Sequence, residues 1–183
     1  GPPTVADFDG DGAPEIGLAS EYYYRVLEAS DGTELWRQRI KDGSSKRTGS
    51  SVFDFEGDGR AEVVYADEDT LWVFDGRSGA IKMEWKDHSS GTLFEYPVIV
   101  DIDRDGSAEI VLATNDYAYP GSHGIKVIGD RDDTWIAARP VWNQHAYSIT
   151  HIDDDGTVPA VFTPNWLTWN TFRAGQDDPR GRP

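Results

Sequence analysis

Short runs of apolar residues, separated by turns, are the dominant pattern along the chain. Between residues 50 and 85 they read SSVF, AEVVYA, TLWVFD and AIKMEW, and each run alternates in polarity or is briefly continuous. Runs of this length, rich in β-branched and aromatic side chains, predict β-strands. Ser30–Thr33 and Arg77–Ala80 contain Gly where a tight reversal needs a positive φ, so both are predicted hairpin turns. No window keeps an apolar helix face over several turns, and the pattern therefore predicts an all-β protein.

The same unit recurs along the chain at a fixed spacing. Acidic segments begin at Asp7, Asp54 and Asp101, which are 47 residues apart each time. Four strands in a repeat of about 40–50 residues are typical of the blades of a β-propeller, whereas a parallel β-helix has much shorter repeats. Each unit is therefore predicted to be a four-stranded antiparallel meander, with the acidic loop joining its first strand to its second. Large aromatic side chains are expected to pack between the blades: Trp36, Trp72 and Trp85.

The repeat predicts three full blades and a partial or terminal fourth within residues 1–173. The units are about 1–49, 50–96, 97–145 and 146–173. The chain is either part of a larger propeller, whose remaining blades come from another chain or segment, or a small four-bladed ring in which residues 165–172 supply late strands. We favour the larger propeller, because an open arc leaves an apolar blade face bare. Residues 174–183 contain turn formers and charge without an apolar pattern, so a disordered tail or linker is expected there.

Each of the first three units contains a nine-residue acidic loop. The loops read DFDGDGAPE, DFEGDGRAE and DIDRDGSAE, with acids at positions 1, 3, 5 and 9 and Gly at position 6. Carboxylates this close repel one another unless a cation lies among them. Calcium prefers oxygen ligands from alternate loop positions, whereas magnesium requires near-octahedral geometry and zinc prefers Cys and His. The loops therefore predict about three calcium sites.

The formal net charge of −16 comes largely from these loops, with four acids in each. Such a charge repels the phosphates of nucleic acids and opposes binding to an anionic membrane surface. The chain has no Cys, which excludes disulfides and thiolate sites, and no apolar stretch approaches the length of a membrane helix. Weak calcium sites suit extracellular calcium concentrations. We therefore expect a secreted or cell-surface protein whose signal peptide is not in this chain.

On these motifs the chain resembles the FG-GAP/VCBS repeat family, the calcium-binding blades of integrin α-subunit-like propellers, in its secreted bacterial form. The D-x-D-x-D-G-x-x-[D/E] loops carry the resemblance, and the segment ARPVWNQHAYSITHIDDDGTVP resembles a terminal blade. The resemblance extends to about Arg173 and implies structural calcium ions that stiffen the blades. The implied metal-binding positions, with position 7 contributing its carbonyl, are Asp7, Asp9, Asp11, Ala13 and Glu15; Asp54, Glu56, Asp58, Arg60 and Glu62; and Asp101, Asp103, Asp105, Ser107 and Glu109.

Two loops depart from the family pattern. Glu56 replaces the usual Asp, and its extra methylene is either absorbed by the geometry or weakens the site. A fourth copy, HIDDDGTVP, has His151 at position 1 and Pro159 at position 9, so that only Asp153 and Asp155 remain in place. We expect this fourth site to be weak or degenerate.

The sequence contains no recognisable catalytic motif such as G-x-S-x-G, HExxH or a P-loop. The segment WNQHAYSITH either lines a pocket or is a connecting loop with satisfied hydrogen bonds, and we favour the loop. The predicted function is a non-enzymatic extracellular module that mediates adhesion or protein or glycan binding, through unknown residues. The alternative is a non-catalytic or partial propeller domain of a secreted polysaccharide-active or redox enzyme. A glycan-binding variant predicts stacking of sugar rings on exposed members of Tyr22–Tyr24, or on Tyr117 and Tyr119.

Overall fold

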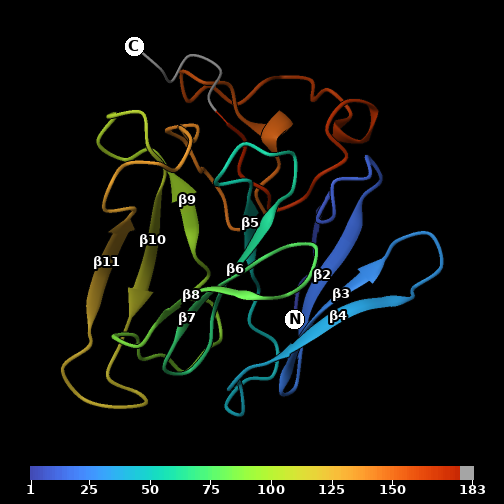
Figure 1. Cartoon of the computed structure of the whole chain (residues 1–183). Helices are drawn as coiled ribbons and strands as arrows, with labels where there is room; N and C mark the ends of the chain where they lie inside the picture. Colours follow the sequence, from blue (N-terminus) through green and yellow to red (C-terminus); the bar gives the residue numbers. More distant parts are fainter. Residues whose placement is uncertain (178–183) are drawn as a thin grey trace.

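The structure, a computed structural model, describes residues 1–177, which form three antiparallel β-sheets side by side (Figure 1). The first sheet contains β1 (Thr4–Ala6), β2 (Glu15–Ser20), β3 (Tyr23–Glu28) and β4 (Glu34–Arg39). The second contains β5 (Ser51–Phe53), β6 (Glu62–Ala66), β7 (Leu71–Phe74) and β8 (Ile81–Trp85). The third contains β9 (Val98–Val100), β10 (Glu109–Thr114) and β11 (Gly124–Gly129). Consecutive strands pair in every sheet, so the predicted meander is confirmed for the first two units.

Within residues 1–177 the third sheet has three strands, so the prediction of a full four-stranded third blade is wrong for the part of the chain that the structure describes. After β11 the chain turns at Asp130, whose Oδ2 accepts hydrogen bonds from the Thr134 N–H and hydroxyl at 2.8 and 2.7 Å. The next residues then pack on the second sheet. The Ile136 N–H donates to the Phe55 carbonyl at 2.9 Å, and the Trp135 ring lies 4.4 Å from the Phe55 ring. The Trp135 and Ile136 side chains pack against the core that contains Phe55. In a fourth strand at the edge of β11 they would face water.

The fourth unit contains no named strand among residues 1–177. It has two single-turn 3₁₀ helices, η1 (Ile149–His151) and η2 (Asn165–Leu167), and neither is long and apolar enough to cross a bilayer. Residues 165–172 are therefore not the late strands of a four-bladed ring. The Asn165 side chain instead bonds to the Thr171 backbone, and Phe172 exchanges backbone hydrogen bonds of 2.9 and 3.0 Å with Val5.

Residues 174–177 pair with the rest of the chain, which differs from the tail expected from residue 174 onward. The Gly175 N–H donates to the Val52 carbonyl at 2.8 Å, and the Gln176 carbonyl accepts from the Arg139 N–H at 3.2 Å. Glycine is required because a Cβ at position 175 would lie 2.9 Å from Phe53 Cδ2. The remainder of the expected tail, residues 178–183, lies outside the described residues.

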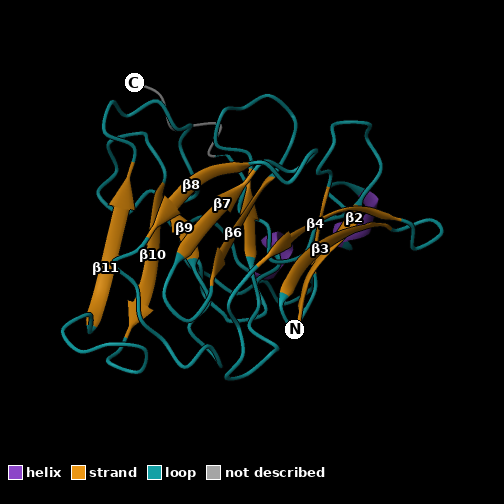
Figure 2. Ribbon diagram, turned by 60° about the horizontal axis from the view of Figure 1, so that its bottom comes forward, coloured by secondary structure: helices purple, strands orange, loops and turns teal. Residues whose placement is uncertain are grey.

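The second sheet packs between the other two, and this position explains its apolar character (Figure 2). Every residue of β6 is buried. Val63 and Tyr65 join a core shared with the first sheet, whereas Val64 and Ala66 join a core shared with the third. A strand covered on both faces can be apolar throughout. The predicted packing of aromatic side chains between sheets is confirmed: Trp36 lies in the first core, Trp72 packs against it, and Trp85 packs against the second core.

The far face of the third sheet is apolar and partly exposed. Val111 pairs with Val127, and Ala113 pairs with Ile125, so the four side chains lie on one face. Ile125 is 66% exposed and Val127 is 50% exposed. One repeat earlier, Val64 is fully buried against the third sheet. The third sheet therefore presents to solvent a face that the second sheet buries.

Candidate metal centres

The first Asp of each acidic loop organises the loop backbone. Asp7 Oδ1 accepts a hydrogen bond from the Gly10 N–H at 2.7 Å, and its Oδ2 accepts from the Gly12 N–H at 2.9 Å. The other two loops repeat this arrangement, with Asp54 bonded to Gly57 and Gly59 and with Asp101 bonded to Arg104 and Gly106. The three loops therefore share one conformation, as their common spacing predicts.

The invariant position 6 needs glycine. Gly12, Gly59 and Gly106 have φ values of 88°, 86° and 91°, in a region that side chains disfavour. Position 4 is also in this region: it is Gly10 in the first loop, Gly57 in the second and Arg104, with φ 66°, in the third. The sharp turn that these residues make lets the carboxylates of alternate positions face one another.

The Glu at position 9 begins the second strand and reaches back into the loop. Glu15 Oε2 accepts a hydrogen bond from the Phe8 N–H at 2.7 Å, and Glu62 and Glu109 accept equivalent bonds from Phe55 and Ile102. Glu15 is fully buried, yet its second oxygen, Oε1, has no hydrogen-bond partner among the described residues. An unpaired buried carboxylate oxygen is costly, and a cation bound beside it would remove this cost.

The structure brings together the acids at positions 1, 3 and 9 of each loop. In each group, one oxygen from every residue lies within 4.8 Å of the others. The groups are Asp7, Asp9 and Glu15; Asp54, Glu56 and Glu62; and Asp101, Asp103 and Glu109. The acid at position 5 lies outside these groups, and its carboxylate accepts a hydrogen bond from the N–H of position 7: Asp11 from Ala13, Asp58 from Arg60 and Asp105 from Ser107.

Burial, together with the crowding of negative charge, raises the pKa of the three glutamates. Burial raises the pKa of Glu15 to about 7, although the hydrogen bond from the Phe8 N–H lowers it. The negative charges of Asp9, Asp7 and Asp11 raise the pKa of Glu15 as well. Burial also raises the pKa of Glu62 to about 7 and that of Glu109 above its ordinary value. A divalent cation favours the ionised form of each group and reverses this shift.

Residues 7–65 and 54–112 match the FG-GAP-like repeat, and the two matches together span more than half of the chain. The chain belongs to the FG-GAP-like repeat family. The resemblance inferred from the acidic loops is therefore confirmed. No curated protein matches the chain by sequence.

The chain is also similar to a solved structure, the crystal structure of the V. cholerae biofilm matrix protein Bap1. The two chains are 32% identical and superpose with a TM-score of 0.83 over 90% of this chain. The match covers 28% of the Bap1 chain, so this chain corresponds to a part of that protein.

The FG-GAP loops have the chemistry that calcium prefers. Every side chain in the three groups supplies a carboxylate oxygen, the ligand type of hard cations. Two oxygens bound to one ion at roughly 2.4 Å lie at most about 4.8 Å apart, which agrees with the separation within each group. In the third loop the buried Ser107 hydroxyl also has no partner among the described residues.

The fourth loop has a different geometry. Asp155, at position 5, accepts from the Thr157 N–H at 2.9 Å as in the other loops, but the Asp153 N–H donates to the Thr157 carbonyl at 2.8 Å. Asp154, between them, forms an ion pair with Arg139, with Nη2 and Oδ1 2.7 Å apart. Within residues 1–177 no group of three potential ligands forms around this loop. The weak or degenerate metal site predicted at Asp153 and Asp155 stays a prediction.

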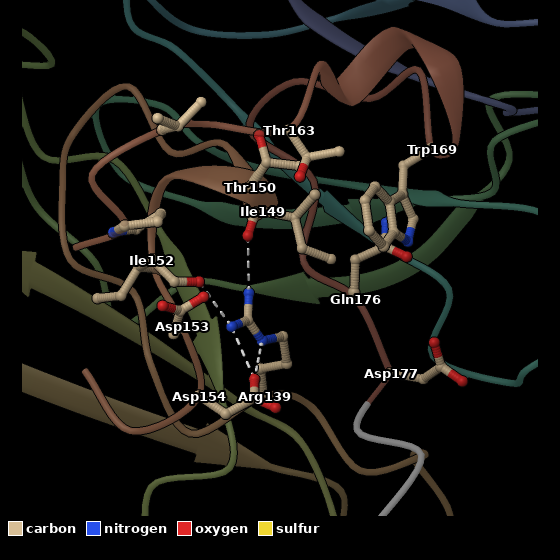
Figure 3. A pocket seen from close by; sticks show the side chains of 12 residues that line it. Arg139, Ile149, Thr150, Ile152, Asp153, Asp154, Thr163, Trp169, Gln176 and Asp177 are labelled. Carbon is tan, nitrogen blue, oxygen red and sulfur yellow. Dashed lines mark hydrogen bonds and ion pairs between the residues drawn. The ribbon is translucent and has the colours of Figure 1, made fainter. Parts of the chain in front are cut away.

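Beside the fourth loop lies a cavity of about 420 Å³ (Figure 3). Arg139 crosses it and donates hydrogen bonds to Tyr147 and to the carbonyls of Ile149 and Ile152. Trp169 contributes an indole ring that is 41% exposed. Ile149 and Thr150 belong to the segment that the sequence offered as a pocket lining, and both line this cavity. The sequence did not single out Arg139 or Trp169 as site residues, because they are far apart in the chain.

The other polar and aromatic candidates are mostly engaged in packing. His145 stacks on Tyr96 with centroids 4.1 Å apart, and Tyr147 stacks on Trp142 at 4.3 Å. Tyr24 is fully buried, so it cannot stack on a sugar, which corrects part of the glycan-binding expectation. Other predicted platforms, Tyr22 and Tyr117, are exposed by 45% and 61%, whereas the Tyr119 hydroxyl donates to the His88 carbonyl.

Proposed function

We propose that this chain is a calcium-stabilised, non-enzymatic FG-GAP module of an extracellular adhesion protein. The observation that carries the proposal is the repeated grouping of three carboxylates, with a buried unpaired oxygen of Glu15 in the first group. The chain's likeness to a part of a biofilm matrix protein supports an extracellular, matrix-associated role. Protein or glycan ligands are the partners that such a role requires.

Calcium has a structural role in this proposal. Each loop joins the first and second strands of a sheet, and the Glu at position 9 is the first residue of the second strand. An ion held between positions 1, 3 and 9 therefore fixes the end of one strand to the start of the next. The first strands of neighbouring sheets contact one another, so this ordering extends across the molecule.

A second class of partner is a further blade, from another chain or segment. The exposed face of Val111, Ala113, Ile125 and Val127 supports it, because the second sheet uses the equivalent face to pack on the third. Apolar patches of this kind mark interaction surfaces.

Calcium titration of the chelator-dialysed protein tests the central proposal. A ligand bound only to the folded state at a hundredfold excess over Kd stabilises it by about 2.7 kcal/mol, which raises the Tm by about 5–10 °C for a chain of this size. Magnesium at the same concentration is expected to have a smaller effect. Equal melting temperatures with calcium and with chelator would contradict the proposal. Binding to immobilised glycans or matrix proteins in calcium and in chelator then tests the adhesion role.

A further inference from the structure

The second acidic loop contains a cation supplied by the protein itself. Lys82 is the second residue of β8, and its Nζ lies 2.5 Å from Glu56 Oε1 and 3.0 Å from Glu62 Oε1. These are two of the three carboxylates of the second group. Glu62 is only 2% exposed, so its ion pair with Lys82 is shielded from solvent.

The first loop has no counterpart of Lys82. In both four-stranded sheets the pairing of the last two strands shifts by one residue, between Val26 and Leu27 in the first and between Val73 and Phe74 in the second. The unpaired residue in the fourth strand is Leu35 in the first sheet and Lys82 in the second. Among residues 1–177 the third sheet has no fourth strand. No ion pair among residues 1–177 involves an acid of the first or third loop.

A second basic side chain acts on the same loop. Arg60, at position 7, pairs with Asp58 at position 5, whereas position 7 is Ala13 in the first loop and Ser107 in the third. Two protein cations therefore meet three of the four acids of the second loop. Glu56 is longer than the Asp found at this position in the other loops, and its carboxylate is the one closest to Lys82.

We propose that Lys82 is a tethered cation that holds the second loop together without metal and lowers the affinity of this loop for divalent ions below that of the first and third loops. The proposal rests on calcium binding by the other loops. A divalent ion entering the second group has to displace the ammonium group or accept its repulsion at short range. Because Lys82 belongs to β8 of the same sheet, its ammonium group stays close to the loop and competes with a divalent ion at a high effective concentration.

The position of Lys82 beside the second loop makes the stability of the three loops depend on calcium to different degrees. The second sheet packs on both neighbours through β6, so its loop is central to the molecule. An internal cation keeps this central loop ordered when calcium is scarce. The first and third loops, without a paired cation, are the ones that respond to calcium.

Calcium titration by calorimetry on the whole chain and on Lys82→Met tests the proposal. Methionine keeps the length of the stem and removes the charge. The unmodified protein is expected to show two tight sites and a third at least about tenfold weaker, and Lys82→Met is expected to show three sites of similar affinity. Lys126→Met is the matched control, because Lys126 pairs with Asp87, outside the loops, at 3.3 Å. Lys82→Arg keeps the charge and is expected to keep the weak third site.

Thermal unfolding in chelator tests the tethered cation without metal. Lys82→Met is expected to lower the Tm more than Lys126→Met, and calcium is expected to restore it. Three equal sites in the unmodified protein, or an unchanged Tm of Lys82→Met in chelator, would overturn the proposal. If the unmodified protein binds no calcium, the proposed function is wrong, and the Tm difference in chelator still decides whether Lys82 stabilises the loop.

Discussion

Arg173 Nε donates a hydrogen bond of 2.8 Å to the carbonyl oxygen of Ser50, which lies 123 positions earlier in the chain. The guanidinium group is 2% exposed, also bonds to the His145 carbonyl and the Ser51 hydroxyl, and lies 4.4 Å above the Tyr96 ring. The residue is therefore a buried link between the C-terminal segment and the start of the second sheet.

Replacement of Arg173 by Met is expected to destabilise the fold by about 2–4 kcal/mol, because the carbonyl oxygens of buried Ser50 and of His145 lose their donor. The midpoint of urea unfolding, at constant calcium, measures the effect. Arg77→Met, on the exposed turn between β7 and β8, is the control and is expected to change the midpoint little. Equal midpoints for the two variants would show that the link contributes nothing to stability.

Replacement of Glu15 by Gln is expected to separate the cost of the buried charge from the gain of metal binding. Gln can still accept the Phe8 hydrogen bond but does not add to the charge of Asp7 and Asp9. The Tm in chelator is therefore expected to stay the same or rise, while the increase in Tm on adding calcium becomes smaller. Glu21→Gln, on an exposed turn, is the control. A calcium-induced increase equal to that of the unmodified protein would exclude Glu15 as a ligand.

Calcium binding is expected to release protons near pH 6. Burial raises the pKa of Glu15 and Glu62 to about 7 from the ordinary 4.5, so between these pH values the calcium-free folded chain holds more protons than the unfolded chain. The stabilising contribution of these protonated groups is present at low pH and is lost as the pH rises toward 7. Because calcium requires ionised ligands, its affinity increases over the same range. Calorimetry at pH 6 in two buffers of different ionisation enthalpy is expected to give different heats, and the difference is expected to vanish at pH 8. Equal heats at pH 6 would contradict the shifted pKa values.

The parts of the fold that the sequence predicted are those held by local interactions. The bonds from Asp7 to Gly10 and Gly12, and the bond from Glu15 to Phe8, join residues at most seven positions apart, so the spacing of acids and glycines encodes them. Alternating apolar residues encode the strands in the same way. The sequence therefore predicted the three loops and the first two sheets.

The parts that it missed depend on contacts between distant segments. The Ile136 backbone bonds to Phe55 and does not extend the third sheet. Which of the two occurs depends on how well the second sheet and the edge of β11 would each cover this segment, and no local sequence pattern shows that. Lys82 reaches Glu56 only because a one-residue shift in the pairing of β7 and β8 turns it toward the loop. Sequence reasoning did not single out Lys82, because the shift in strand pairing is seen only in the structure.

Replacement of Val127 by Glu tests whether the far face of the third sheet is an interaction surface. Val127 is 50% exposed and lies opposite Val111, at the centre of an apolar face whose equivalent in the second sheet is buried. Analytical ultracentrifugation of the unmodified chain is expected to show concentration-dependent association, since exposed apolar area is removed from water on contact. A charge on this face is costly to bury, so Val127→Glu is expected to remain monomeric with an unchanged Tm. Ala29→Glu adds the same charge on the exposed turn after β3 and is expected to associate like the unmodified chain. Identical sedimentation of the three proteins would mean that this face does not bring blades together.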